Sequence, residues 1–154
     1  MPHLQEYGPD GLVLEAWWGE IGSAELLVHE KHHLLAAKPR LAPRAIVDLT
    51  MARFDSSVGK RQIEALTDLY LQYQDIVAGS RVAIVVGSDI DKARLYEKYA
   101  KERGLNVVVF NTIEVACVWL GADATHVREW MREAPTRATA QVSEVEVADQ
   151  GRDF

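Results

Sequence analysis

The sequence predicts an α/β domain with a mixed, mostly parallel sheet of about five strands, an N-terminal hairpin and packed helices. Apolar runs typical of buried strands alternate with segments in which apolar residues recur every three or four positions. Helices between such strands imply crossover connections, and therefore parallel pairing. The chain has 154 residues, which suits one ordinary domain.

The chain begins with the predicted hairpin. Residues 3–7 are a candidate short strand and residues 12–18 a second one, and the turn-forming residues 8–11 lie between them. One face of the second strand is wholly apolar, so we expect it to meet the core. That face consists of Leu12, Leu14, Ala16 and Trp18. On the other face, Trp17 is a candidate for covering a partner or an apolar ligand.

Helices and strands then alternate along the chain. We expect a helix over residues 23–37, which ends because Pro39 disfavours a helical conformation in the residue before it. The later predicted elements, in chain order, are a strand at 45–49, a helix at 61–73, a strand at 82–86, a helix around 93–100, a strand at 107–110 and a helix at 113–120.

The pattern weakens in the last part of the chain. Residues 125–132 have the apolar spacing of a short helix, but from Pro135 onward small and polar residues dominate without helical periodicity. We therefore divide the chain into an α/β domain at 1–121 and a C-terminal part at 122–154, a helix followed by a mobile tail. A short added strand around 144–147 is the alternative.

Composition narrows the classes of function. With 17 Lys and Arg against 23 Asp and Glu, the formal net charge is −6, so we expect no nucleic-acid binding, which usually needs a basic surface. No apolar run approaches the roughly 20 residues of a membrane-spanning helix, and the first residues lack the pattern of a secretory signal. The single Cys117 excludes an intrachain disulfide and favours a reducing compartment. We therefore expect a cytoplasmic protein without a cofactor.

One predicted helix contains a possible metal-binding motif. His29, Glu30 and His33 match the pattern H-E-x-x-H. Residues four apart lie one helical turn apart, so the two histidines could grip one Zn²⁺ while Glu30 acts as general base on a metal-bound water. A zinc-dependent hydrolase is therefore one alternative. The other interpretation is a helix face whose histidines are solvated or packed.

A second motif follows the strand at 45–49. Asp48 lies at the end of this strand, and Asp55, Ser56 and Ser57 precede a predicted helix. This segment resembles the STAS domains of anti-sigma-factor antagonists, in which a strand ending in Asp-Leu leads through a short loop to Asp-Ser-Ser-Gly. The resemblance implies a switch in which a partner kinase phosphorylates a serine and the added charge breaks docking.

The spacing of this motif leaves the phosphorylated residue open. Val58 separates Ser57 from Gly59, and the loop is one residue shorter than in the family. Aligned without a gap, Ser57 is the acceptor, whereas aligned on the local motif, Ser56 is the acceptor. The alternative to a switch is that Asp55 or Ser56 only caps the following helix.

The resemblance covers about residues 8–121. The strands at 82–86 and 107–110 and the helix containing Tyr96 look like a bacterial, stage-II-sporulation-AA-like branch, which is grouped with CRAL-TRIO-type lipid-binding proteins. It implies a non-enzymatic regulatory or interaction module with a protein partner, such as a kinase or an anti-sigma-like regulator, and a homodimer is compatible with it. A carrier of a small apolar or lipid ligand is a further alternative.

Overall fold

One mixed five-stranded sheet forms the centre of the molecule. The computed structural model describes residues 3–8, 10–36 and 44–150. The strands, in their order across the sheet, are β1 (His3–Tyr7), β2 (Leu12–Ile21), β3 (Arg44–Phe54), β4 (Arg81–Val86) and β5 (Asn106–Phe110). β1 pairs antiparallel with β2, and the other neighbours pair in parallel. The predicted α/β fold with its N-terminal hairpin is thus confirmed.

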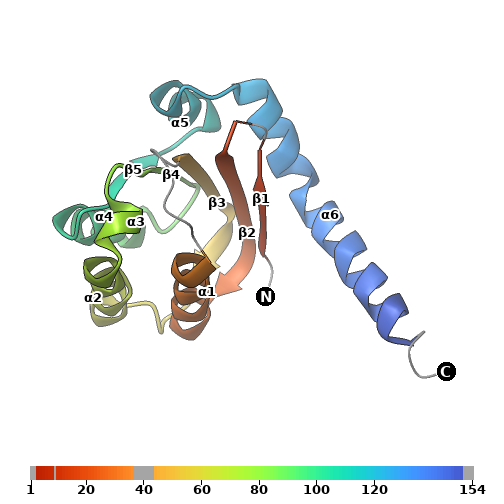
Figure 1. The fold of residues 1–154 in the computed structure, drawn as a ribbon, viewed down its shortest axis with the longest axis horizontal. Coiled ribbons are helices and arrows are strands. Elements are labelled where there is room, and N and C mark those ends of the chain that lie inside the picture. The colour runs from red at the N-terminus through yellow and green to blue at the C-terminus, as the bar shows by residue number, and fades with distance from the viewer. Residues whose placement is uncertain (1–2, 9, 37–43, 151–154) are drawn as a thin grey trace.

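Helices cover both faces of this sheet (Figure 1). The first face carries α1 (Ser23–Ala36), α2 (Lys60–Asp68), the 3-10 helix η1 (Leu69–Gln72), α3 (Gln74–Val77) and α4 (Ile90–Glu102). The second face carries α5 (Ile113–Leu120) and α6 (Ala124–Gln150). The helix predicted over residues 61–73 is divided into α2 and the 3-10 helix η1, and it ends where the backbone of Tyr73 leaves the helical region.

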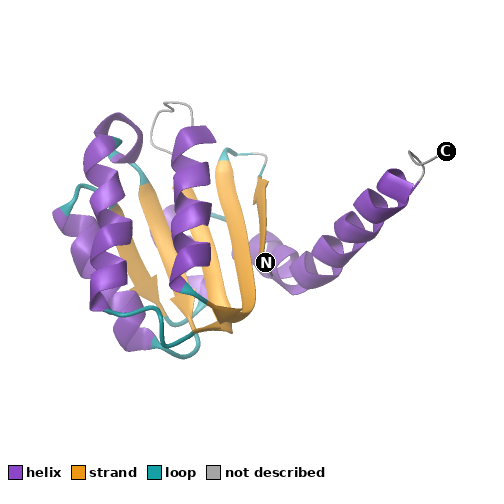
Figure 2. Cartoon of the chain, turned by 90° about the horizontal axis from the view of Figure 1, so that it is seen from below, coloured by secondary structure: helices purple, strands orange, loops and turns teal. Residues whose placement is uncertain are grey.

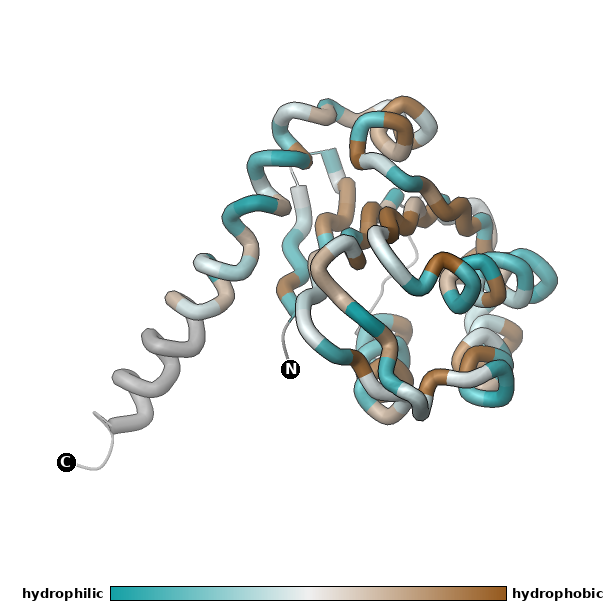
Figure 3. Tube along the Cα trace, turned by 180° about the vertical axis from the view of Figure 1, so that it is seen from behind, coloured by the Kyte–Doolittle hydropathy of each residue, from teal (hydrophilic) through white to brown (hydrophobic). Residues whose placement is uncertain are grey.

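The alternation of side chains along β2 creates two cores. Leu12, Leu14 and Ala16 pack against α5 and α6, as their apolar pattern predicts. Trp17 packs on the opposite face, among residues of α1 and η1, and is 3% exposed. Both faces of β2 are consequently buried, and hydrophobic residues concentrate in the strands while hydrophilic ones follow the outer helices (Figure 3).

The C-terminal region differs from its prediction. We expected a mobile tail after a short helix, but α6 continues through Pro135 to Gln150 and extends away from the sheet (Figures 1 and 2). Its first half belongs to the main core, where Val127, Trp130 and Ala134 are buried. Residues 137–140 of α6 are partly buried or exposed, so this part of the helix requires no apolar stripe and no helical periodicity in its apolar residues. Within the described part of the chain, no helix has both the length and the hydropathy to cross a membrane.

Candidate ligand-binding cavity

A cavity of about 340 Å³ lies between the sheet and the helices α1, α2 and α4. The sheet contributes apolar side chains from three neighbouring strands, namely Val13, Trp17, Val47, Leu49 and Ile84. The helices contribute Leu26, Leu34, Ile63 and Leu66. The cavity is therefore mainly apolar, and its volume lies at the lower end of the roughly 300–1,000 Å³ of small-molecule sites.

The cavity arises because the helices do not meet the middle of the sheet. α1 lies over the β1 and β2 side, whereas α2 and α4 pack on each other and α4 packs on β5. Ala45, Val47 and Val82 belong to the central strands β3 and β4, yet they are only partly buried. Because these side chains are small, they leave space in front of the sheet that the helices do not fill.

One polar contact in the cavity joins β2 to α1. The Nε2 atom of His29 lies 2.6 Å from Oε1 of Glu15, and both side chains are close to fully buried. Burial disfavours the charged imidazole, but the hydrogen bond and charge of Glu15, together with the charge of Glu30, outweigh it and raise the pKa of His29. The ring of Trp17 packs edge-on against His29, with 4.9 Å between centroids. The pair is thus held in an aromatic, water-poor environment.

A second polar contact joins β1 to α1. Nε2 of Gln5 lies 3.0 Å from Nδ1 of His33. Gln5 is opposite Glu15 in the β1–β2 pairing, so both polar side chains project from the same face toward α1. The helix face with His29 and His33 is therefore packed on polar residues of the hairpin.

A third group spans the cavity from α1 to α4. Tyr70 forms hydrogen bonds with Glu30 on one side and with the hydroxyl of Tyr96 on the other. Burial raises the pKa of Glu30, and the charge of Glu15 acts in the same direction, whereas His33, His29 and the bond to Tyr70 oppose it. Burial likewise raises the pKa of Tyr70 and Tyr96. Glu30, Tyr70 and Tyr96 thus form one continuous hydrogen-bonded chain.

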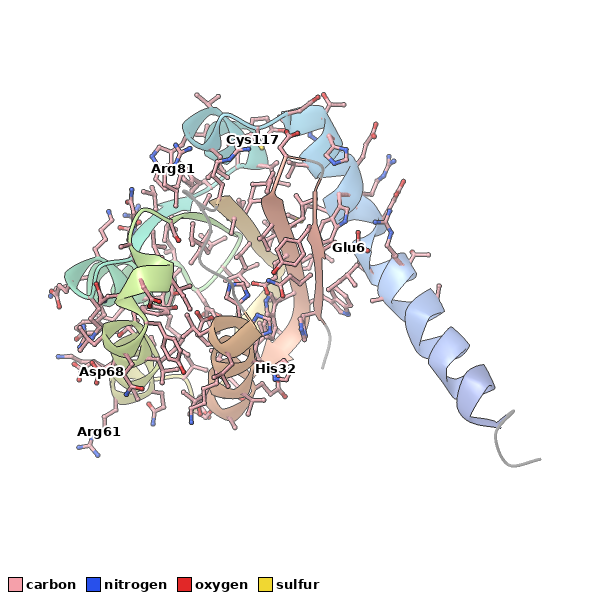
Figure 4. The ribbon with its side chains drawn as sticks, viewed as in Figure 1. Glu6, His32, Arg61, Asp68, Arg81 and Cys117 are labelled. Carbon is pink, nitrogen blue, oxygen red and sulfur yellow. The ribbon has the colours of Figure 1, made fainter. Side chains whose placement is uncertain are left out.

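The residues of the predicted zinc motif face this cavity, but in other roles. His29 contacts Glu15, His33 contacts Gln5, and the two imidazole centroids lie 6.4 Å apart. His32, between them, is exposed (Figure 4). Among the described residues, no group of three or more His, Cys, Asp or Glu side chains is arranged to hold a metal ion. The described residues therefore provide no third ligand for a zinc ion held by His29 and His33.

Two residues of the predicted switch lie together at the start of α1. Asp55 Oδ1 accepts hydrogen bonds from the amide and the hydroxyl of Ser57, at 2.8 and 2.5 Å. The Ser57 hydroxyl in turn accepts a bond of 2.9 Å from the amide of Ser23, the first residue of α1. These bonds from Ser57, and the charge of Lys92, lower the pKa of Asp55. The segment therefore connects the end of β3 with the helix that covers the cavity.

The other two predicted switch residues lie elsewhere. Asp48 is buried where β3 pairs with Ala16, on the face toward α5 and α6, and it accepts a bond from the amide of Thr50. Ser56 is exposed. The capping alternative is wrong, because α2 starts at Lys60 with Gly59 as its N-cap.

No family model matches this chain, and no curated protein matches it either. The resemblance to STAS domains thus stays a prediction.

Sequence reasoning identified only part of this site. Glu15, Gln5, Tyr70 and Tyr96 were not recognised as site residues. The sequence offered one signal, the carboxylate of Glu15 in an otherwise apolar run. Because both faces of β2 are covered, this side chain is buried. Buried carboxylates need a partner, and this would have directed attention to the histidines of the next helix.

Proposed function

We propose that this protein is a non-enzymatic regulatory module that encloses a small, mainly apolar molecule between the sheet and α1, α2 and α4. The cavity of about 340 Å³ is the observation that carries this proposal. Its composition supports it further, because an apolar wall with a few convergent polar groups is typical of ligand pockets. A cytoplasmic location is part of the proposal and is supported by the free, buried thiol of Cys117.

Ligand binding and a regulatory role are compatible because α1 takes part in both. Leu26, His29 and Leu34 of α1 line the cavity, and the first amide of α1 contacts Ser57. A molecule in the cavity that shifts α1 would therefore change the exposed surface around Ser57. A protein partner that binds this surface would then distinguish the loaded from the empty form.

The proposal is tested with an uncharged apolar dye, N-phenyl-1-naphthylamine, whose fluorescence rises on transfer from water. We expect the Val47→Phe variant, which fills the middle of the cavity, to lose at least about tenfold in affinity. Val108→Phe is the matched control, since Val108 is also a half-buried strand valine but lies outside the cavity. Equal dye affinity of Val47→Phe and Val108→Phe would contradict the proposal.

A second candidate function is a phosphorylation switch at Ser57. It is favoured by the exposure of Ser57 and by its position between Asp55 and the first amide of α1. A phosphate there would meet the carboxylate of Asp55 and replace the present bonds, so it would reorganise the start of α1. The kinase remains the proposed partner.

The switch is tested by the intact mass of the denatured protein purified from its native host, followed by mapping of the modified residue. We expect a phosphate adduct that is absent from Ser57→Ala and retained in Ser56→Ala. An unmodified mass, or a phosphate on Ser56, would contradict the assignment to Ser57.

A further inference from the structure

Two arginines lie side by side at the end of the cavity where β3 and β4 begin. Arg44 and Arg81 are the first residues of these strands, and they are directly paired in the parallel register. Both line the cavity, and so do the next residues, Ala45 and Val82. Because side chains alternate along a strand, Ala45 and Val82 belong to the wall of the cavity, whereas the two arginines lie at its rim. The rim therefore carries two cationic side chains.

No carboxylate of the described part of the chain neutralises this pair, because neither arginine forms an ion pair there. Nη1 of Arg44 donates to the backbone oxygens of Leu120 and Gly121, at 2.6 and 3.3 Å. Nη1 of Arg81 donates to that of Trp119, at 2.9 Å. These oxygens lie at the C-terminal end of α5, which carries only about half of an elementary negative charge. The two guanidinium groups thus keep a net charge of about +1.5 at the rim.

The bonds to α5 leave most donors of the two arginines for other partners. A guanidinium group has five N–H donors in a planar fork that matches a carboxylate or a phosphate. Among the described residues, only Nη1 of each arginine is bonded, and both side chains are only partly buried. Cζ of Arg81 also lies 5.7 Å from the ring centroid of Trp119, which helps to hold this guanidinium beside α5 (Figure 4). The Nε and Nη2 groups are therefore available to an anion at the rim.

The carboxylates of the cavity lie away from this rim. Glu15 is paired with Val47, three residues beyond Arg44 on β3, and this separation is about 10 Å along the strand. Its carboxylate already contacts His29. Glu30 follows His29 on α1, which lies over β1 and β2 (Figure 1), whereas the arginines begin β3 and β4. An anion at the rim is therefore close to two cations and distant from the Glu15 carboxylate.

The third cationic side chain of the cavity is already engaged. Lys92 donates to the backbone oxygen of Asp55 at 3.1 Å, and its charge acts on the Asp55 carboxylate. Lys92 belongs to α4, which follows the end of β4, so it lies at the opposite end of this strand from Arg81. One ammonium group beside a carboxylate is a poorer anion site than two guanidinium forks without one. The rim with its two arginines is thus the better place for an anion.

We propose that the ligand is an amphiphile whose apolar chain lies between the sheet and the helices α1, α2 and α4 and whose carboxylate or phosphate group binds Arg44 and Arg81 at the rim. This inference rests on the proposed function and adds the charge of the ligand and its direction in the cavity. An alkylammonium ligand in the same direction would meet two like charges, and an uncharged ligand would leave the arginine pair without an anion.

The test compares four amphiphiles of equal chain length that differ in their polar group: dodecanoate, dodecyl phosphate, dodecan-1-ol and dodecylammonium. Each competes with N-phenyl-1-naphthylamine for the wild-type protein, below its critical micelle concentration. We expect at least one of the two anions to displace the dye at a concentration at least about tenfold lower than the alcohol, since hydrogen bonds between charged groups are the stronger ones. The comparison of the two anions distinguishes a carboxylate ligand from a phosphate ligand.

Three variants locate the anion. Arg44→Gln and Arg81→Gln should each reduce the preference for the anion over the alcohol at least about threefold, and both changes together should abolish it. The amide of Gln can still donate to the backbone oxygens of α5. Arg53→Gln is the matched control, since Arg53 is an exposed arginine of β3 that does not line the cavity. Unchanged affinity for the uncharged dye shows that a variant keeps its cavity, and each arginine tests the inference if the other variant does not fold.

The outcomes distinguish this inference from the proposed function. If the anions and the alcohol displace the dye equally, or if the arginine variants keep the preference of Arg53→Gln, the cavity binds ligands but the inference is wrong. Tighter binding of dodecylammonium would also overturn it, as would loss of the preference in Lys92→Gln alone. If neither the dye nor any of the four amphiphiles binds, the proposed function itself fails.

Discussion

His29 and Glu15 form a buried ion pair that joins α1 to the sheet, with 2.6 Å between Nε2 and Oε1. Glu15 lies on a strand whose neighbouring residues are apolar and buried, and among the described residues His29 is the partner with which it forms an ion pair. The pair therefore fixes α1 over the cavity at a point where packing alone leaves space. Its consequences can be measured.

Replacing His29 should destabilise the protein strongly. His29→Ala leaves the Glu15 carboxylate buried without its partner, for which we expect a loss of about 3 kcal/mol in the free energy of unfolding. His32→Ala is the matched control, because His32 is an exposed histidine of the same helix, and we expect it to change little. Urea denaturation measures the free energy of unfolding of both variants. Similar losses for His29→Ala and His32→Ala would show that the ion pair does not stabilise the fold.

The same pair predicts a dependence on pH. Because the pKa of His29 is raised in the folded protein, its charged form stabilises the fold fully below the unfolded value of about 6.5. This contribution is lost as the pH rises through the folded pKa. We expect the stability difference between wild type and His29→Gln to shrink between neutral and alkaline pH, and a constant difference would contradict the raised pKa.

The stability contribution of Glu30 should depend on pH with the same sign as that of His29. Its pKa is raised chiefly by burial, so the folded state holds the proton at pH values where the unfolded chain releases it. Stability is therefore greatest below the unfolded pKa and falls as the pH rises toward the folded one. Glu30→Gln keeps a neutral side chain, and we expect it to be more stable than wild type near neutral pH and equal to it in acid.

A pH series of unfolding curves tests this prediction for Glu30. Glu129→Gln, at an exposed position of α6, is the control for removing one negative charge. If the free energies of unfolding of Glu30→Gln and wild type differ by a constant amount over the whole pH range, then burial does not raise the pKa of Glu30.

The sequence predicts the fold well because its strongest signals report burial. The runs at 82–86 and 107–110 are apolar because both faces of β4 and most of β5 are covered. Because these signals report burial, they did not identify the C-terminal half of α6 as a helix. Few of its described residues face a core, so its helical state leaves no periodic pattern.

The candidate site is less predictable because its contacts join distant segments. The spacing of His29, Glu30 and His33 correctly indicates three residues with related orientation on α1. Their partners come from β2, η1 and β1, and the spacing of residues along a helix holds no information about contacts with other elements. The motif alone therefore predicts a metal site, while the partners Gln5 and Glu15 give the histidines another role.

Ser57 and Ser56 should differ in their effect on stability although they are neighbours. The Ser57 hydroxyl accepts a bond from the first amide of α1 and donates to Asp55, so Ser57→Ala should cost about 1 kcal/mol, as for loss of a helix N-cap. Ser56 is exposed, and Ser56→Ala should have no measurable effect. Thermal unfolding of both variants checks this, and equal melting temperatures would mean that the Ser57 contacts do not hold α1.

The two halves of α6 should contribute very differently to folding. Val127, Trp130 and Met131 are buried in the core with β1 and β2. Glu6 of β1 lies beside α6 (Figure 4) and accepts hydrogen bonds from Trp130 and Arg137. Each large apolar side chain contributes roughly 1.5–3 kcal/mol when buried, and a whole domain is stable by only about 5–15 kcal/mol.

A chain that ends at residue 121 should therefore lose cooperative unfolding, because it exposes the core against which α6 packs. A chain that ends at residue 140 keeps these contacts, and we expect its free energy of unfolding to stay within about 0.5 kcal/mol of the full chain. Urea denaturation followed by tryptophan fluorescence compares the two, since Trp17, Trp18 and Trp119 remain in both. Cooperative unfolding of residues 1–121 would restore the division at residue 121 that the sequence predicts and would make α6 an accessory helix.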